Sequence, residues 1–403
     1  MSVIKERPGL GPLHRAWRLL PPAARRKGAR ALSMALAPRR DAAPPARSAG
    51  VAVAGEMGRV SGLGEAARLL HAGCAAAGAD RGAVTLGLLR APAPPVPRDA
   101  ALILHANAPV IPLMLARAPR NFLRGRRVIG FWNWELPILP EEWRAGSAYV
   151  HEIWTPSAFT KAALEGMFPG LVRLVPYPLA ALPLPPADPG RAALGLPGDA
   201  VVTSVIANLG ASFARKNPLG AIAAHRLAFG GRQDRILVLK LAGGAAFPAD
   251  LARVTAAIGD SPNIRLIDEV WPGSRIHGLI AASDMVLSLH RAEGFGLVPA
   301  EAMLRGVPVV ATGWSGNLQF MDPESAGLVP YRLAPVEDER GDYALPGAVW
   351  AEPDTGAAAS LLRALADDPA RRAALGGRGR DHAMSALGAG PLLAALDAAG
   401  IAH

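Results

Sequence analysis

The sequence predicts an α/β protein made of two doubly wound, Rossmann-like domains that face each other across a cleft. Three observations lead to this fold class. The chain has 403 residues, which is too many for one ordinary hydrophobic core and suits two. From residue 50 onward, short β-rich runs alternate with alanine-rich helical stretches, as in parallel sheets covered by helices. A proline-rich break before residue 200 divides this pattern into two similar halves.

The first half contains six expected strands. They are expected at residues 50–55, 83–89, 101–106, 127–132, 152–156 and 171–177. The stretches EAARLLHAGCAAAG and SAFTKAALEGMF between them are expected to be helical, and Ser157 caps the second one directly after Pro156. The segment 179–199 is rich in proline and has no periodicity, which is typical of a linker. We therefore place the first domain at residues 49–185.

The second half repeats the pattern. Strands are expected at residues 201–207, 235–242, 263–268, 284–290, 307–312 and 325–331. The stretches PLGAIAAHRLAF, SRIHGLIAA, VPAEAMLRG and TGAAASLLRALADD supply the helices between and after them. The second domain is predicted at residues 186–375, and a helical tail that packs back on the first domain at 376–403. In such sheets ligands bind beyond the carboxyl ends of the strands.

Most of the net charge of +10 lies in the first 48 residues. They hold eleven Lys and Arg against Glu6 and Asp41, a net charge of +9, which leaves about +1 for the rest of the chain. Two alternatives stay open for this leader: it is disordered and solvated, or HRAWRLL and ARRKGARALSMAL form basic amphipathic helices on an anionic membrane surface. The near-neutral remainder argues against nucleic acid as a partner.

Several classes of protein are excluded by composition. No charge-free run of 18 apolar residues is present, and the start has no secretory signal. The single Cys74 excludes an internal disulfide and a cysteine-based zinc site. We expect a cytoplasmic protein, with peripheral contact at the inner face of the cell membrane if the leader binds lipid.

The stretch HRAEGFGLVPAEAMLRGVPVV at residues 290–310 holds the most specific motif. Glu293 lies in a loop at the carboxyl end of an expected strand, and Pro299 places Glu301 in the first turn of the next helix. Free N–H groups from Gly296 onward would attract phosphate. The two carboxylates then suit the hydroxyls of a sugar and of a ribose at opposite ends of one ligand. The alternative is a helix cap and a solvated loop acid.

Cations are placed to neutralise such a ligand. In NLGASFARKNP, Arg215 and Lys216 follow an expected strand and directly precede a helix. Adjacent cations at the mouth of a cleft suit a diphosphate leaving group, whose charge they would stabilise as it departs. Lys240, at the end of another expected strand, is a third candidate.

The first domain offers weaker signals. Gly62 and Gly64 in GEMGRVSGLGEAARLL permit a close backbone approach to a ligand, although tight packing explains them nearly as well. His105 ends an expected strand and faces the same cleft, with a structural role as the alternative. In GFWNWELP, Trp134 and Glu135 suit contact with a sugar ring, or the aromatic residues form a hydrophobic plug.

Together these motifs resemble retaining glycosyltransferases of the GT-B fold, in the family-4 group (glycosyl transferases group 1). The resemblance covers residues 50–370 and rests on EGFGLVPAE, RKNP, SGLGEAAR, and FWNWELP followed by IWTPSAFTKAAL. The chain departs from the family's pattern at Asn208, where an aspartate is frequent, and in ATGWSGNLQF, which holds Trp314 and Asn317.

The resemblance implies roles for named residues. The catalytic group is Glu293, Arg215, Lys216 and His105; the donor-binding group is Glu301, Gly294, Phe295, Gly296, Leu297, Gly62, Gly64 and Lys240; the acceptor-binding group is Trp134 and Glu135. The resemblance implies no metal and no cofactor.

The expected function is transfer of a sugar, with retained configuration, from a nucleotide-sugar donor to a hydroxyl of a glycan or lipid-linked acceptor in cell-surface polysaccharide synthesis. Two alternatives remain. One is a nucleotide-sugar epimerase that uses the same two-domain cleft. The other is a non-catalytic basic protein that binds membrane or nucleic acid.

Overall fold

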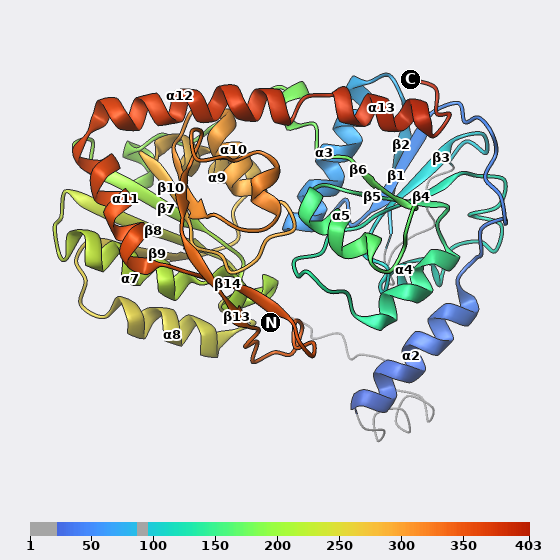
Figure 1. The fold of residues 1–403 in the computed structure, drawn as a ribbon, viewed down its shortest axis with the longest axis horizontal. Coiled ribbons are helices and arrows are strands. Elements are labelled where there is room, and N and C mark those ends of the chain that lie inside the picture. Colours follow the sequence, from blue (N-terminus) through green and yellow to red (C-terminus); the bar gives the residue numbers. More distant parts are fainter. Residues whose placement is uncertain (1–21, 87–95) are drawn as a thin grey trace, which may run out of the picture.

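The computed structural model describes residues 22–86 and 96–403. Two six-stranded sheets lie side by side, each covered by helices (Figure 1). Every strand pair within these two sheets is parallel. The predicted fold class is therefore confirmed. The HRAWRLL part of the leader and residues 87–89 of an expected strand lie outside the described residues.

The first sheet has the strand order β2-β1-β3-β4-β5-β6. Its strands are β1 Val51–Gly55, β2 Asp80–Thr85, β3 Ala101–His105, β4 Val128–Phe131, β5 Glu152–Thr155 and β6 Val172–Leu174. Its helices are α3 Gly62–Ala76, α4 Ile111–Leu115 and α5 Ala158–Glu165, with the 3-10 helices η1 Glu141–Ala148 and η2 Leu179–Ala181. Strand β6 ends earlier than the expected 171–177, where Pro176 has no N–H to donate to a neighbouring strand.

The second sheet has the order β12-β11-β10-β7-β8-β9. Its strands are β7 Val201–Ile206, β8 Arg235–Leu241, β9 Ile264–Asp268, β10 Met285–Ser288, β11 Val309–Thr312 and β12 Gly327–Val329. Its helices are α6 Phe213–Lys216, α7 Pro218–Phe229, α8 Pro248–Ile258, α9 Gly273–Ala282, α10 Leu297–Leu304 and α11 Thr355–Asp367, with the 3-10 helices η3 Ala192–Leu194, η4 Leu209–Ala211 and η5 Gly316–Gln319.

The strand orders locate the place where a ligand can bind. In the second sheet β7 and β10 are neighbours, while β8 continues the sheet to one side of them and β11 to the other. The loops after β7 and β10 therefore diverge at a topological switch point, which is where doubly wound sheets bind ligands. In the first sheet the corresponding neighbours are β1 and β3.

A β-hairpin that the sequence did not reveal follows the second sheet. Strands β13 Tyr331–Pro335 and β14 Val349–Pro353 pair antiparallel. Although the hairpin belongs to the second half of the chain, Ala348 and Trp350 are buried in the hydrophobic cluster of the first domain. The hairpin thus joins the two domains.

The end of the chain crosses back to the first domain. Helix α12 Pro369–Ala386 lies along the second domain and α13 Gly390–Ala398 covers the first (Figure 1). Leu392 on α13 is 1% exposed and packs on Gly73 of α3. Beyond it, Ser48 and Gly400 are hydrogen-bonded through their backbones, N to O, at 2.9 Å.

Part of the leader is helical. Helix α2 Pro22–Leu36 contains the whole ARRKGARALSMAL stretch and extends away from the first domain in Figure 1. Arg30 pairs with Glu142 of η1 at 3.0 Å. Within residues 22–86 and 96–403, none of the helices has the length and apolar character needed to span a bilayer.

The return of α13 should contribute measurably to stability. Leu392→Ala would leave a cavity beside Gly73 and is expected to lower the free energy of unfolding by about 2–5 kcal/mol. Urea denaturation measures this change. The matched control is Leu227→Ala on α7, because Leu227 is 58% exposed; equal losses in both variants would contradict the packing described here.

Candidate active site

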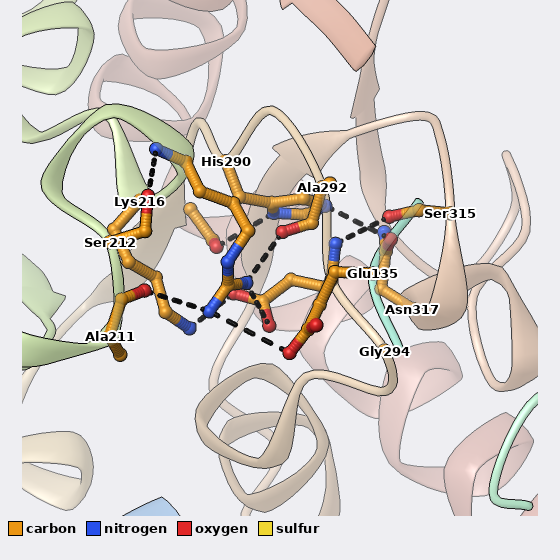
Figure 2. A network of polar contacts seen from close by, with 12 residues as sticks. Glu135, Ala211, Ser212, Lys216, His290, Ala292, Gly294, Ser315 and Asn317 are labelled. Atoms are coloured by element: carbon orange, nitrogen blue, oxygen red, sulfur yellow. Dashed lines mark hydrogen bonds and ion pairs between the residues drawn. The ribbon is translucent and has the colours of Figure 1, made fainter. Parts of the chain in front are cut away.

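Three charged side chains meet at the switch point of the second sheet. Arg215 and Lys216 end α6, in the connection after β7, and Glu293 lies in the loop after β10. Arg215 Nη1 lies 3.2 Å from Glu293 Oε2, and Lys216 Nζ binds Glu293 Oε1. Arg215 also donates to the carbonyl of Ala292 at 2.7 Å, as part of the network in Figure 2. The fold thus brings together three of the four residues predicted to be catalytic.

Arg215 and Glu293 are buried and ionised. Arg215 is 4% exposed and Glu293 is 8% exposed. Burial alone would raise the pKa of the Glu293 carboxyl, but Lys216 and Arg215 outweigh it and hold that pKa at about 2. Glu293 is therefore anionic at neutral pH, and its carboxylate is paired with both cations.

Backbone strain surrounds this cluster. Within the described part of the chain, the non-glycine residues with positive φ are Ser212 (66°), Asn217 (51°) and Ser315 (83°), an uncommon conformation that concentrates at functional sites. Ser212 and Asn217 flank α6 and cap α6 and α7. Ser315 Oγ accepts the N–H of Glu293 at 2.9 Å. All three thus hold the backbone that presents the charged residues.

Glu135 of the first domain and Tyr343 of the hairpin loop complete the cluster. Glu135 Oε1 lies 3.9 Å from Arg215 Nη2, and the Tyr343 hydroxyl donates to Glu135 Oε2 at 3.1 Å. The Arg215 guanidinium lies 5.6 Å from the centre of the Tyr343 ring. Sequence reasoning missed Tyr343, because its loop has no motif and the partners of its side chain at the cluster are distant along the chain.

The Trp134 side chain lies in the interior of the protein. It is 7% exposed and donates its indole N–H to the carbonyl of Ile138 at 2.7 Å. Its ring packs edge-on against Trp143 and, tilted by 30°, against Tyr343. These contacts favour the hydrophobic-plug alternative over stacking on a sugar, so only Glu135 of the predicted acceptor pair is presented at the cluster.

The turn before α10 is held by both domains. Ser157 of the first domain donates its hydroxyl to the carbonyl of Gly294 at 2.7 Å. Phe295 is 4% exposed and packs edge-on against Tyr177 of the first domain. Gly296 has φ of 98° and is the N-cap of α10, with no side-chain cap, so the N–H groups from Leu297 onward face the switch point unpaired by a side chain.

Glu301 lies one turn deeper than predicted. Because α10 begins at Leu297, immediately after the positive-φ Gly296, Glu301 falls in the second turn of the helix. Burial, and to a lesser degree the like charge of Glu65 on α3, raise the pKa of its carboxyl to about 8, against the opposing effect of Arg305. Its Oε2 lies 3.8 Å from Nδ1 of His277, whose own pKa is lowered by burial. At neutral pH this contact therefore joins two neutral groups.

The two glycines of the first domain differ. A Cβ at Gly64 would lie 2.3 Å from the carbonyl oxygen of Arg59, so the loop's own packing requires this glycine. A Cβ at Gly62 would meet nothing within 4 Å, which leaves room for a ligand. Ser61 caps α3 by accepting the N–H of Gly64 at 3.1 Å.

His105 is buried at the carboxyl end of β3. Burial lowers the pKa of its imidazole to about 4, so the ring is neutral. Its Nε2 is 2.9 Å from the Tyr177 hydroxyl, and the ring stacks on Phe131. Tyr177 in turn contacts Phe295, which connects His105 indirectly to the turn before α10. No contact joins His105 to the charged cluster within the described chain.

The Lys240 ammonium is hydrogen-bonded away from the charged cluster. It is 2% exposed, and its ammonium donates to the carbonyls of Leu241 at 2.9 Å and Glu269 at 2.7 Å. It lies 5.2 Å from the centre of the Trp271 ring, and burial lowers its pKa to about 8. These contacts lie apart from Arg215 and Lys216.

The raised pKa of Glu301 predicts a pH-dependent contribution to stability. A carboxyl whose pKa is higher in the folded chain than in the unfolded chain keeps its proton on folding, so its contribution to stability falls as pH rises from about 5 to about 8. Glu301→Gln should remove this dependence. Unfolding midpoints at pH 5, 6.5 and 8 measure it, with Glu324→Gln at an exposed position as the control; an unchanged pH dependence in Glu301→Gln would contradict the assignment.

Sequence comparison finds proteins that are similar to the part of the chain that contains this site. Residues 218–341 match the model of the family described as Glycosyl transferases group 1, a segment that includes Glu293 and Glu301. A D-inositol 3-phosphate glycosyltransferase of Kineococcus radiotolerans is 31% identical over 225 residues, which are 53% of this chain and 48% of the relative. The chain spans about half the length of the curated relatives it matches.

Solved structures match nearly the whole chain. Anabaena HepE, in complex with UDP and glucose, has a TM-score of 0.60 at 14% identity, over 87% of this chain and 99% of HepE. WaaG, a glycosyltransferase involved in lipopolysaccharide biosynthesis, has a TM-score of 0.54 at 16% identity, over 86% of this chain and 99% of WaaG. At these identities the likeness concerns the fold. The GT-B and glycosyltransferase parts of the resemblance drawn from the motifs are confirmed, while retention stays a prediction: the chain has the GT-B fold of glycosyltransferases, and residues 218–341 match the glycosyl transferases group 1.

Proposed function

We propose that this chain transfers a sugar from a nucleotide-sugar donor to an acceptor hydroxyl, with retention of the anomeric configuration. The observation that carries the proposal is the cluster of buried Arg215 and Glu293 with the partly exposed Lys216, beside the uncapped N-terminus of α10 at the switch point of the second sheet. Cations and a helix N-terminus at one point suit the diphosphate of such a donor.

The donor extends along the loop after β10. Its diphosphate meets Lys216 first, because the Lys216 side chain is 24% exposed and that of Arg215 only 4%. Glu301 binds the ribose hydroxyls, and its protonated carboxyl can both donate and accept hydrogen bonds. Glu293 binds hydroxyls of the donor sugar. The open space at Gly62 admits the ligand from the first domain.

The chemistry proceeds on one face of the sugar. The bond from the anomeric carbon to the donor phosphate breaks, the acceptor oxygen bonds to the same carbon, and the acceptor proton passes to the departing phosphate oxygen. Arg215 and Lys216 stabilise the charge on that phosphate. Glu293 and Glu135 both face Arg215, at 3.2 and 3.9 Å, which favours this direct route over attack by a carboxylate.

The acceptor approaches from the first domain. Glu135 is the predicted acceptor residue that reaches the cluster, and its side chain is 20% exposed. A glycan or lipid-linked acceptor in cell-surface polysaccharide synthesis agrees with the role of WaaG in lipopolysaccharide biosynthesis. Peripheral membrane contact through residues 1–48 belongs to the same proposal. HepE structures with UDP and with UDP-glucose make uridine donors the first to test.

A panel of nucleotide sugars tests the proposal. Purified chain is heated with UDP-, GDP- and ADP-sugars, and one base is expected to raise the unfolding temperature, since a ligand at 100 times its Kd stabilises by about 2.7 kcal/mol. Transfer to candidate acceptors with that donor is then followed, and NMR of the product gives the anomeric configuration. Absence of stabilisation and of transfer with every donor would refute the proposal; an inverted product would refute retention alone.

Lys216→Ala should abolish most of the transfer and leave the fold intact. Loss of one cation from the leaving phosphate is expected to lower kcat by about 10²–10³-fold. Lys216 is the better target than Arg215, whose full burial would make its removal destabilising. Arg380→Ala on α12, where the side chain is 61% exposed, is the control. Full activity in folded Lys216→Ala would contradict the assigned role.

Tyr343→Phe should weaken catalysis through Arg215. The change removes the hydrogen bond to Glu135 and leaves the ring in place, so Glu135 no longer has a fixed position beside Arg215. Kinetics should show a fall in kcat of about tenfold, equivalent to one hydrogen bond of about 1.4 kcal/mol, with a smaller change in KM. Tyr331→Phe on the same hairpin, 41% exposed, should behave as wild type. A purely structural role for Tyr343 would instead change the unfolding temperature and not kcat.

A further inference from the structure

A basic hollow lies at the opposite end of the first sheet from the charged cluster. It has a volume of about 420 Å³ and opens where β4, β5 and β6 begin. Its charged and titratable lining residues are Arg40, Arg127, His151, Glu152, Lys161 and Arg173. Because Glu135, which contacts Arg215, follows the carboxyl end of β4, this hollow is separate from the charged cluster.

The hollow holds an excess of positive charge. Among the described residues that line it, Glu152 is the one carboxylate, set against four permanent cations. Glu152 is shared between Arg127 at 3.4 Å and Arg173 at 3.8 Å, so one negative charge serves two guanidinium groups. A concave surface lined by one sign of charge concentrates its field and attracts ions of the other sign.

Side chains at the floor of the hollow donate hydrogen bonds to backbone carbonyls of the leader. Arg127 Nη2 donates to the carbonyl of Pro45 at 3.2 Å, and Arg40 Nη1 donates to that of Asp41 at 2.8 Å. His151 Nδ1 accepts the N–H of Val128 at 3.0 Å, which leaves Nε2 to donate to the carbonyl of Asp41 at 3.2 Å. Burial lowers the pKa of His151, and Arg40 and Arg127 lower it further, so the ring is neutral with one fixed tautomer.

The rim keeps donors available for a ligand. The Arg173 side chain is 41% exposed and, within the described chain, forms no hydrogen bond besides its 3.8 Å ion pair. Lys161 is 40% exposed and reaches Glu165 only at 4.0 Å. Both side chains can therefore turn to a bound anion without breaking a hydrogen bond, while the floor residues stay in place.

We propose that this hollow binds a phosphate ester. Guanidinium groups with free N–H pairs match phosphate oxygens in geometry and charge, and the volume is that of a small-ligand site. Among the described residues, the lining contains no Phe, Tyr or Trp on which a base could stack, so nucleic acid is not the expected ligand. The phosphate comes either from a soluble ester or from a phospholipid headgroup, which share this chemistry. The proposal does not depend on sugar transfer.

Binding of simple phosphates tests the site in the full chain. Calorimetry with sn-glycerol 3-phosphate and inorganic phosphate is performed on Lys216→Ala, so that the cluster in the cleft does not add a second phosphate site. Ionic strength is fixed with chloride, because exposed charges are screened by salt. Arg173→Gln combined with Lys161→Gln, in the same background, is expected to weaken binding at least tenfold. Arg144→Gln, 60% exposed on η1 and outside the hollow, should bind unchanged.

Vesicles distinguish the two sources of phosphate. Binding to phosphatidylglycerol vesicles over phosphatidylcholine vesicles, reduced by the double substitution, assigns the site to a lipid headgroup. Loss of glycerol 3-phosphate binding with vesicle binding unaffected assigns it to a soluble ester. Equal phosphate binding in the double variant and its parent, or no binding beyond that of chloride, would overturn the proposal, whether or not the wild-type chain transfers sugar.

Discussion

The ion pair between Arg215 and Glu293 is the constraint on which the site depends. Both groups are almost fully buried, and a buried charge without its partner is strongly destabilising, by about 3–5 kcal/mol. The loops after β7 and β10 must therefore keep a fixed position relative to each other. This requirement accounts for the positive φ angles of Ser212 and Ser315, since the hydrogen bonds that these residues form hold the backbone that carries the two charges.

The same loop also holds the domains together. A Cβ at Gly294 would lie 3.2 Å from the carbonyl oxygen of Trp134 in the first domain, and a Cβ at Gly316 would lie 2.2 Å from that of Gly294. The turn is thus compressed between the first domain and the first residue of η5, and the Ser157 hydroxyl donates to the carbonyl of Gly294. Because the atoms that join the domains also surround Glu293, a change in domain closure necessarily moves the charged cluster.

Sequence reasoning located the residues whose positions follow from strand ends. Arg215, Lys216 and Glu293 each follow a parallel strand, and neighbouring parallel strands place their following loops together. Tyr343 could not be found in this way, because a hairpin loop carries no periodicity and its partner Glu135 lies 208 positions away in the chain. Composition likewise cannot distinguish a buried tryptophan from one that stacks on a sugar ring. The two alternatives for Trp134 therefore stayed open until its packing was known. The starting point of α10 was missed by one residue, since proline marks the first turn of a helix but not which position in it.

The free site is electrically balanced, and this decides how a donor must enter. Arg215 and Lys216 carry two positive charges, and Glu293 and Glu135 lie within 4 Å of them with two negative charges. A bound diphosphate brings further negative charge. One of the two cations must therefore leave its carboxylate partner to pair with the diphosphate. Lys216 is the group that can move, because its side chain is the most exposed cation of the cluster and it holds Glu293 through one ammonium group. Arg215 stays fixed by the carbonyls of Ala292 and Ala211 whatever the carboxylates do. Under the proposed function, donor binding is then an exchange in which the phosphate would replace Glu293 at Lys216 and free that carboxylate to accept hydrogen bonds from the sugar.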